Sequence, residues 1–297
     1  MTHLVELRAG RLSLALAPTI GGCVAHFRHD AFDLMRRMRT PLGMEDHALH
    51  SGMFPMVPFA NSVRDNQFTV DARTYHLRPN MQGSGLNYHG SGWQRAWQVN
   101  EVTESQCVLE LNEVEETAGY AFSSTQRFRL DSDKLEVSIA VSNRSPARMP
   151  FGVGLHPWFP RHLGAEVTFN ARSELTTDAQ FQARDFVPTP PASDYSGGRE
   201  PPLRFVNQCF GDWDQKASIL WPKQALLLTM KVTPIFSYLM LHVPRHDAGV
   251  FCIEPQSNRT SAFDGLDADR PAGGAHMLSP GQTIAGSVCF SVHDLGN

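Results

Sequence analysis

Two histidines and a glutamate stand where a titratable side chain is costly unless it has a purpose. His89 lies in NYHGSGWQRAWQV (residues 87–99), His156 in FGVGLHPWFPR (residues 151–161), and Glu254 ends the apolar run of VFCIEPQSN (residues 250–258). Burying such groups costs free energy unless they are paired, hydrogen-bonded or facing a cleft. A glutamate and a histidine can supply a deprotonated and a protonated group at the same pH, since the free groups titrate near about 4.3 and about 6.5. These residue types are consistent with acid–base chemistry.

Each of the three residues also has a structural interpretation. The two glycines after His89 either let the backbone approach a ligand, with Trp93 stacking on a sugar ring, or form a simple turn whose tryptophans are core. His156 is otherwise a core histidine, and Glu254 a strand-end carboxylate that reaches solvent. A metal site is disfavoured, because the H-x-H and H-E-x-x-H spacings are absent and 67 and 98 residues separate the three side chains.

The elements that must position these residues follow a period of two. In LEVSIAVSN (residues 135–143), apolar side chains alternate with polar or small ones, as in a half-buried strand. The turn-forming DSDK precedes it, so residues 126–143 are predicted to form a hairpin. Similar strand-like segments are RLSLALA, CVLEL, AEVTFNA, ASILW, ALLLTMKV, YLMLHV, VFCIEP and GSVCFSV. Short strands without βαβ alternation predict an all-β protein, a large antiparallel β-sandwich, with one domain over residues 1–297.

Two segments depart from this period. DAFDLMRRMR, within residues 30–50, has helical character and is expected to make a turn or two of helix before Pro41. Residues 187–202, VPTPPASDYSGGREPP, hold five prolines and two glycines. We expect a long loop of the same domain there, rather than an interdomain linker, and expect it to border a binding cleft.

Composition limits the classes of partner. The 297 residues carry 26 basic and 30 acidic side chains, a formal charge of −4, without a basic block. Nucleic acid and anionic membranes are therefore not expected as partners. No run of about twenty uncharged apolar residues occurs, and the N-terminus lacks a signal-peptide pattern. The five scattered cysteines are typical of reduced thiols, so we expect a cytoplasmic protein.

Four segments in register resemble the aldose 1-epimerase (galactose mutarotase-like) family, over nearly the whole chain. NYHGSGW resembles the family's histidine-glycine motif, GLHPWF its histidine-x-aromatic-phenylalanine motif, and IEPQ its glutamate-x-glutamine motif. PFANSVRDNQFTVDARTYHL (residues 58–77) resembles the strand pair that usually opens with proline, an aromatic residue, alanine, asparagine and arginine.

The resemblance implies a β-supersandwich, no cofactor and no metal, and interconversion of the α and β anomers of a free sugar. By matching motif positions, Glu254 is expected to be the general base that takes the anomeric hydroxyl proton. His156 is expected to be the general acid that protonates the ring oxygen, and His89 to hydrogen-bond the sugar. The expected partner is a small-molecule sugar, bound by a monomer or homodimer.

Departures from the family pattern bear on the sugar. Ser62 stands where the family often has an arginine, and the next basic residue is Arg64. Asn207 stands where the family has a sugar-binding aspartate, so Asp212 or Asp214 is expected to substitute. The expected sugar-binding residues are Asn61, Arg64, Trp93, Asn207, Asp212, Asp214 and Gln256. Two alternatives stay open: a hexose-6-phosphate 1-epimerase, which needs basic side chains at the cleft, and a non-catalytic sugar-binding or regulatory protein of the same fold.

Overall fold

The computed structural model describes residues 4–39, 47–81, 83–115, 120–266 and 271–296. The described residues form the strands β1 (Val5–Ala9), β2 (Leu12–Ala17), β3 (Cys23–His29), β4 (Phe32–Asp33), β5 (Met53–Met56), β6 (Gln67–Val70), β7 (Arg73–His76), β8 (Gln98–Val102), β9 (Gln106–Glu115), β10 (Tyr120–Leu130), β11 (Lys134–Asn143), β12 (Met149–Phe151), β13 (Gly154–Pro160), β14 (Glu166–Thr177), β15 (Ala183–Pro188), β16 (Val206–Trp221), β17 (Leu226–Val232), β18 (Tyr238–Val243), β19 (Val250–Gln256), β20 (His276–Leu278) and β21 (Thr283–Asp294). The helices are short 3-10 turns: η1 (Ala48–His50), η2 (Arg64–Asn66), η3 (Gly92–Gln94), η4 (Pro191–Ser193) and η5 (Pro222–Gln224).

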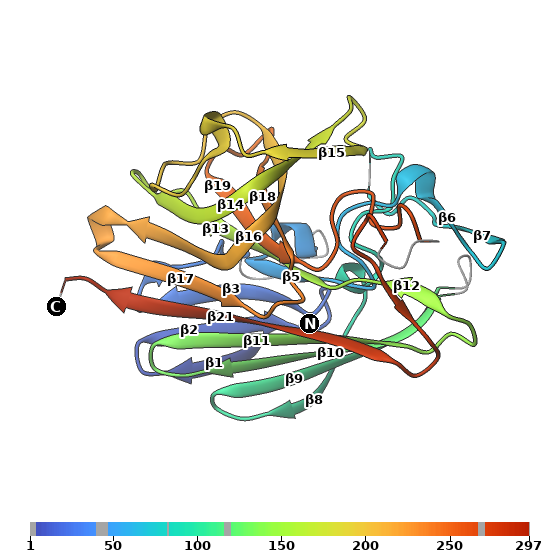
Figure 1. Ribbon diagram of the computed structural model, residues 1–297. Coiled ribbons are helices and arrows are strands. Elements are labelled where there is room, and N and C mark those ends of the chain that lie inside the picture. The colour runs from blue at the N-terminus through green and yellow to red at the C-terminus, as the bar shows by residue number, and fades with distance from the viewer. Residues whose placement is uncertain (1–3, 40–46, 82, 116–119, 267–270, 297) are drawn as a thin grey trace.

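Seventeen strands are hydrogen-bonded into one sheet, and β12–β20 and β6–β7 form two small pairs. In Figure 1, β8, β9, β10, β11 and β21 lie along one side of the molecule, and β13, β14, β16, β18 and β19 along the other. Every strand pairing in the described ranges is antiparallel. The predicted all-β supersandwich is confirmed, and so is the hairpin, in which β10 and β11 meet at Leu130 and Leu135.

The core lies between the two sides and explains the alternating sequence. On β11, the apolar side chains from Leu135 to Val141 are fully buried, while the intervening ones are partly exposed. On the opposite side, Phe251 and Ile253 of β19 belong to the same hydrophobic cluster. Each such burial stabilises the fold by about 1.5–3 kcal/mol. The residues between them, Cys252 and Glu254, therefore point to the other face of β19.

Two irregular segments differ in part from what the sequence predicts. Residues 32–33 form a short strand rather than the start of a helix, and the described helical turn in this region is η1, after Pro41 rather than before it. Part of residues 30–50, including Pro41, lies outside the described residues. Residues 187–202 contain the end of β15, the turn η4 and otherwise irregular backbone, as expected for a long loop. The segment does not line the pocket described below, which is lined by Phe181 and Phe205 on either side of it. Val187 and Pro188 line a separate hollow.

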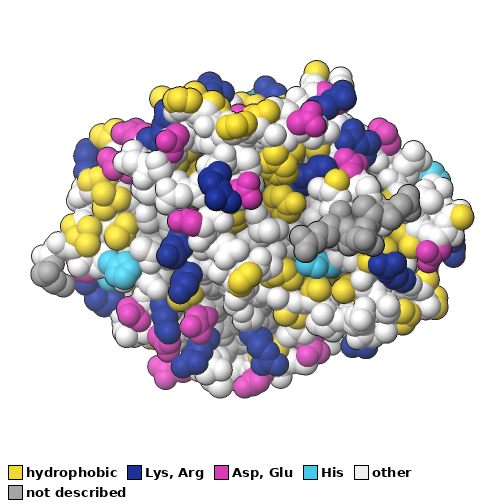
Figure 2. All heavy atoms as spheres, viewed as in Figure 1, with side chains coloured by type: hydrophobic (Ala, Val, Ile, Leu, Met, Phe, Trp, Pro, Cys, Tyr) yellow, Lys and Arg dark blue, Asp and Glu magenta, His cyan; other side chains and the backbone are white. Residues whose placement is uncertain are grey.

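The surface mixes charges of both signs. On the face shown in Figure 2, Lys and Arg side chains lie among Asp and Glu side chains and do not gather into one patch. Within the described ranges, no helix has the length and apolar character needed to cross a membrane.

Candidate active site

The face of β13, β19, β18 and β16 that points away from the main core carries the titratable residues in rows, because side chains that pair across neighbouring strands lie side by side. One row consists of Trp158, Cys252, His242 and Asn207. The next row begins on β5 and consists of Phe54, His156, Glu254 and Met240. Residues 98 positions apart in the sequence thus become neighbours because β13 pairs with β19.

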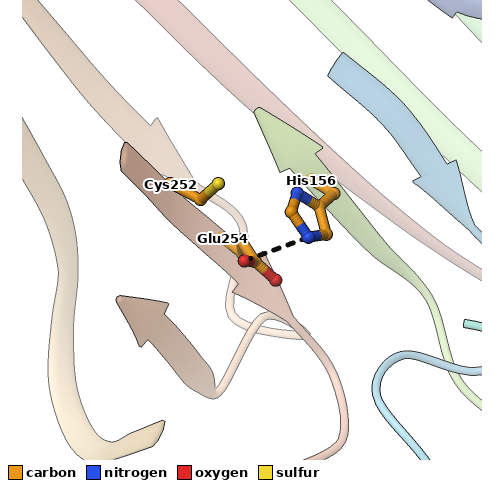
Figure 3. A group of neighbouring side chains, drawn as sticks. All are labelled: His156, Cys252 and Glu254. Carbon is orange, nitrogen blue, oxygen red and sulfur yellow. Dashed lines mark ion pairs between the residues drawn. The ribbon is translucent and has the colours of Figure 1, made fainter. Parts of the chain in front are cut away.

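His156 and Glu254 are in direct contact: Nε2 of the imidazole lies 3.2 Å from Oε1 of the carboxyl group (Figure 3). The exposed fractions of the two residues are 5% and 2%. The imidazole stacks on Phe54, with ring centroids 4.4 Å apart, and on Trp158, with centroids 5.0 Å apart. Trp158 of the aromatic segment around His156 and Phe54 of β5 therefore hold the ring plane and keep water away.

Burial dominates the protonation of this pair. It raises the pKa of Glu254 well above its usual range and lowers the pKa of His156 well below its usual range, where His89, His242 and Arg36 add to the effect. Both shifts favour the neutral forms, a protonated carboxyl group beside an uncharged imidazole. The free-group values suggested the opposite, a charged histidine beside a charged glutamate, and burial is the reason for the difference.

His89 is oriented by a reciprocal backbone contact with Asn61. The backbone N–H of Asn61 donates to Nδ1 of His89 over 3.1 Å, and the backbone N–H of His89 donates to the carbonyl of Asn61 over 2.7 Å. Because Nδ1 accepts, the neutral ring carries its proton on Nε2. Burial, with a contribution from His242, lowers the pKa of His89 to about 3. His89 is therefore a neutral hydrogen-bond donor rather than an acid.

The glycine after His89 is required by the loop's own backbone. Gly90 has φ +64°, and a Cβ atom there would lie 2.3 Å from Cδ of Pro58. Any side chain would displace the Val57–Pro58 segment, from which Asn61 follows. Gly90 is therefore needed for close packing of its loop against Val57 and Pro58, and not for the approach of a ligand.

A pocket of about 320 Å³ opens over the His156–Glu254 pair. Its wall has an apolar part made of Leu49, Met81, Trp158, Phe181 and Phe205. The polar part is made of Asn61, Ser62, Tyr88, His89, His156, Asn207, His242, Glu254 and Thr260. None of the described lining residues is a lysine or an arginine.

Asn207 and His242 form a polar pair in this wall, with Nδ1 of His242 3.1 Å from Oδ1 of Asn207. Since Oδ1 can only accept, Nδ1 donates, and the lone pair of His242 Nε2 and the amide hydrogens of Asn207 remain for a ligand. Burial lowers the pKa of His242 to about 4, so the ring stays neutral near pH 7. Sequence analysis missed His242. The available signal was the alternation of YLMLHV. Leu239 and Leu241 belong to the main core, so His242 points to the opposite face of the strand.

Arg64 does not reach the pocket. Its guanidinium donates to both carboxylate oxygens of Asp264, over 3.1 and 2.8 Å, and to the carbonyl of Ala183 over 2.9 Å. The arginine is thus tied to the fold, and Ser62 occupies the wall position.

Asp212 and Asp214, which were expected to bind the sugar, are not among the residues that line the pocket. Strand β16 pairs with β18 only over residues 206–210, and Asp212 has a left-handed φ of 48° just beyond that point. Its carboxylate is largely exposed and accepts from Ser173 over 3.3 Å, while Asp214 accepts from Asn170 over 3.1 Å. The strand has turned away from the pocket before it reaches either aspartate.

Trp93 and Gln256 support the site from behind it. The indole Nε1 of Trp93 donates to the carbonyl of Tyr88 over 3.0 Å, and the ring packs on Phe54. Trp93 does not line this pocket but lines a neighbouring one, which shares Leu49 and Met81 with it. Gln256 is fully buried, and its Oε1 accepts from Nδ2 of Asn61 over 2.8 Å. Of the sugar-binding residues expected from the sequence, Asn61 and Asn207 line the pocket.

Residues 3–291 match the model of the family described as aldose 1-epimerase. The chain belongs to this family. It is 30% identical to the uncharacterised protein YphB of Escherichia coli K12 over 299 residues, which are 97% of this chain and 98% of the relative. The aldose 1-epimerase family thus includes the chain over nearly its whole length, as its motifs indicated.

Solved structures of the same fold agree. A protein of Escherichia coli K12, described provisionally as an aldose 1-epimerase, superposes with a TM-score of 0.90 at 27% identity, covering 99% of this chain and 100% of that one. A galactose mutarotase-like protein of Clostridium acetobutylicum superposes with a TM-score of 0.87 at 18% identity, covering 99% and 96%. The galactose mutarotase-like β-supersandwich is therefore the fold of this chain.

Proposed function

We propose that the protein is an aldose 1-epimerase that interconverts the α and β anomers of a free, unphosphorylated aldose. The observation that carries this proposal is the buried contact of 3.2 Å between His156 and Glu254 under a pocket of about 320 Å³. That volume is at the small end of the range of about 300–1,000 Å³ for ligand sites, and it suits a single sugar ring.

The pair carries one transferable proton, which the reaction requires. Hydroxyl groups of a bound sugar that donate to Glu254 stabilise its carboxylate, and the shared proton then moves to His156. Glu254 takes the proton of the anomeric hydroxyl while His156 protonates the ring oxygen, and the bond between that oxygen and C1 breaks. The open aldehyde turns about its C1–C2 bond, and closure on the other face returns both protons. His89 donates from Nε2 to a sugar oxygen without changing its charge.

The wall of the pocket favours a neutral sugar. A phosphate ester carries a dianion that proteins usually bind with Arg or Lys side chains. The described lining residues include neither, and Arg64 is already paired with Asp264. The polar groups that remain, Asn61, Asn207 and His242, are neutral donors and acceptors suited to hydroxyl groups. A hexose-6-phosphate 1-epimerase therefore ranks second.

A polarimetric assay tests the proposal directly. Freshly dissolved α-glucose and α-galactose should approach equilibrium faster with the protein than without it, after correction for spontaneous mutarotation. Glucose 6-phosphate should show little acceleration at the same protein concentration. Preference for the phosphate ester would select the second candidate, whereas measurable sugar binding without acceleration of any aldose would indicate a non-catalytic sugar-binding protein.

A further inference from the structure

The His156–Glu254 pair has a third neighbour that can bind metal, Cys252. Cys252 and Glu254 are two residues apart on β19 and point to the same face, where their side chains converge with His156 from β13 (Figure 3). One ligand atom from each residue lies within 4.8 Å of the other two. In the part of the chain that the structure describes, this is the one such group of His, Cys, Asp and Glu, and it differs from the set of His89, His156 and Glu254 weighed from the sequence.

The spacing of the ligand atoms is close to that of a tetrahedral zinc site. With bonds of about 2.0–2.2 Å, nitrogen and oxygen ligands on one tetrahedral ion lie about 3.3–3.5 Å apart. The separation of His156 Nε2 and Glu254 Oε1 is 3.2 Å. With a thiolate bond of about 2.3 Å, the sulfur of a tetrahedral site lies about 3.6 Å from the other ligand atoms. The Cys252 sulfur is at most 4.8 Å from them, so each of these distances has to shorten by about 1.2 Å at most.

We propose that His156, Cys252 and Glu254 form an inhibitory site for a soft divalent cation such as Zn²⁺ or Cd²⁺. Imidazole, thiolate and carboxylate ligands suit these ions, whereas Mg²⁺ and Ca²⁺ prefer oxygen ligands. Three protein ligands leave a fourth position open, as in catalytic zinc sites.

Binding is weak enough to be reversible for two reasons. Nδ1 of His156 has no hydrogen-bond partner among the described residues, while the second nitrogen of a resident metal's histidine is usually held by one. The guanidinium of Arg36 lies 4.1 Å from the ring centroid of Trp158, the cross-strand neighbour of Cys252, and its positive charge opposes that of the ion. The metal is therefore an inhibitor and not a resident cofactor.

Coordination of a cation occupies Glu254 and His156, the general base and general acid of the proposed reaction. The thiol proton of Cys252 and the proton shared by His156 and Glu254 leave for solvent when the cation binds. Neither general base nor general acid then remains, and the ion competes with the sugar. The site itself stands independently of the proposed function, whereas the inhibition rests on it.

Cadmium binding tests the site without any enzyme assay. Titration of the purified protein with Cd²⁺ should give a larger ultraviolet thiolate-to-cadmium absorbance than titration of Cys252→Ala or Cys252→Ser, which lack the contribution of Cys252. The matched control is Cys107→Ala, which removes another buried thiol, on β9 at the other side of the molecule, and should leave the absorbance unchanged. Absorbance from the partly buried Cys289 is common to all four proteins and is subtracted with the Cys252 variants.

Zinc inhibition gives the second readout. Zn²⁺ should slow mutarotation by the wild type and by Cys107→Ala, competitively with sugar and reversibly with EDTA. The inhibition constant of Cys252→Ala should rise by at least about 100-fold, since loss of even an outer-shell partner costs about 10- to 100-fold. Equal inhibition of wild type and Cys252→Ala, or the same cadmium absorbance in both, would overturn the proposal. If no aldose is epimerised at all, the cadmium titration still decides whether the site exists.

Discussion

Replacing Glu254 by glutamine should nearly abolish anomer interconversion. The amide keeps the shape of the side chain on the pocket floor but cannot accept the anomeric proton. A positioned acid or base contributes about 10²–10⁴-fold to a rate, equivalent to about 2.7–5.4 kcal/mol of activation free energy. Because His156 Nε2 lies 3.2 Å from Glu254 and shares its proton, the substitution disturbs both groups, and we expect a loss of about 10³–10⁴-fold.

The matched control for Glu254→Gln is Asp212→Asn, which makes the same chemical change on a largely exposed carboxylate outside the pocket. Its rate should stay within about two-fold of wild type, as expected for a surface substitution. Both proteins are assayed by polarimetry, with circular dichroism to check folding and calorimetry to check sugar binding. A folded Glu254→Gln protein that retains more than a tenth of the wild-type rate would remove Glu254 from the mechanism.

Five further tests probe the site and its surroundings. The pH profile of kcat/KM should be a bell belonging to the pair: the one-proton form is lost as pH rises through the raised pKa of Glu254 and as pH falls through the lowered pKa of His156. His156→Asn should remove the acid limb and cost about 100- to 10,000-fold in rate, and a variant with an unchanged profile would contradict this assignment. His242→Phe should raise KM by about 3- to 10-fold, the worth of one hydrogen bond, with a smaller change in kcat. Arg64→Ala should leave KM unchanged and lower the unfolding free energy by about 1 kcal/mol or less, measured by urea titration, because its ion pair with Asp264 is partly exposed. Activity should survive exhaustive EDTA treatment, and its loss with recovery on adding a divalent ion would indicate a metal-dependent reaction.

The fold could be predicted from the sequence because strands such as β10 and β11 alternate buried with more exposed side chains. The alternation of LEVSIAVSN sets which side chains of β11 enter the core, and the turn DSDK fixes the register of β10 against β11. The short helical pattern after residue 30 failed because Leu34 and Met35 are buried by the sheet rather than by a helical face.

The site could be predicted only in part. The motifs located His89, His156 and Glu254, whose side-chain types suit acid–base chemistry, and the structure brings these three to one pocket. Cross-strand pairing, by contrast, depends on which distant strands become neighbours. His242 enters the pocket because β18 lies between β19 and β16, and no local pattern encodes that order.

Besides cross-strand pairing, the burial of the titratable groups could not be predicted from the sequence. The free-group pKa values could not show that both groups are buried, which shifts the pKa of His156 down and the pKa of Glu254 up, toward the neutral forms. Likewise, the direction of Asp212 depends on a single left-handed residue conformation where β16 leaves β18.

The most direct test of the proposed activity is magnetization exchange between the anomeric protons of an aldose at equilibrium, measured by NMR across a panel of unphosphorylated sugars. This measurement needs no freshly prepared anomer and detects catalysis in both directions at once. The wild-type protein should accelerate exchange for at least one sugar of the panel, and Glu254→Gln should not. Exchange at the spontaneous rate for every aldose, with folded protein that binds sugar, would contradict the proposed mutarotase.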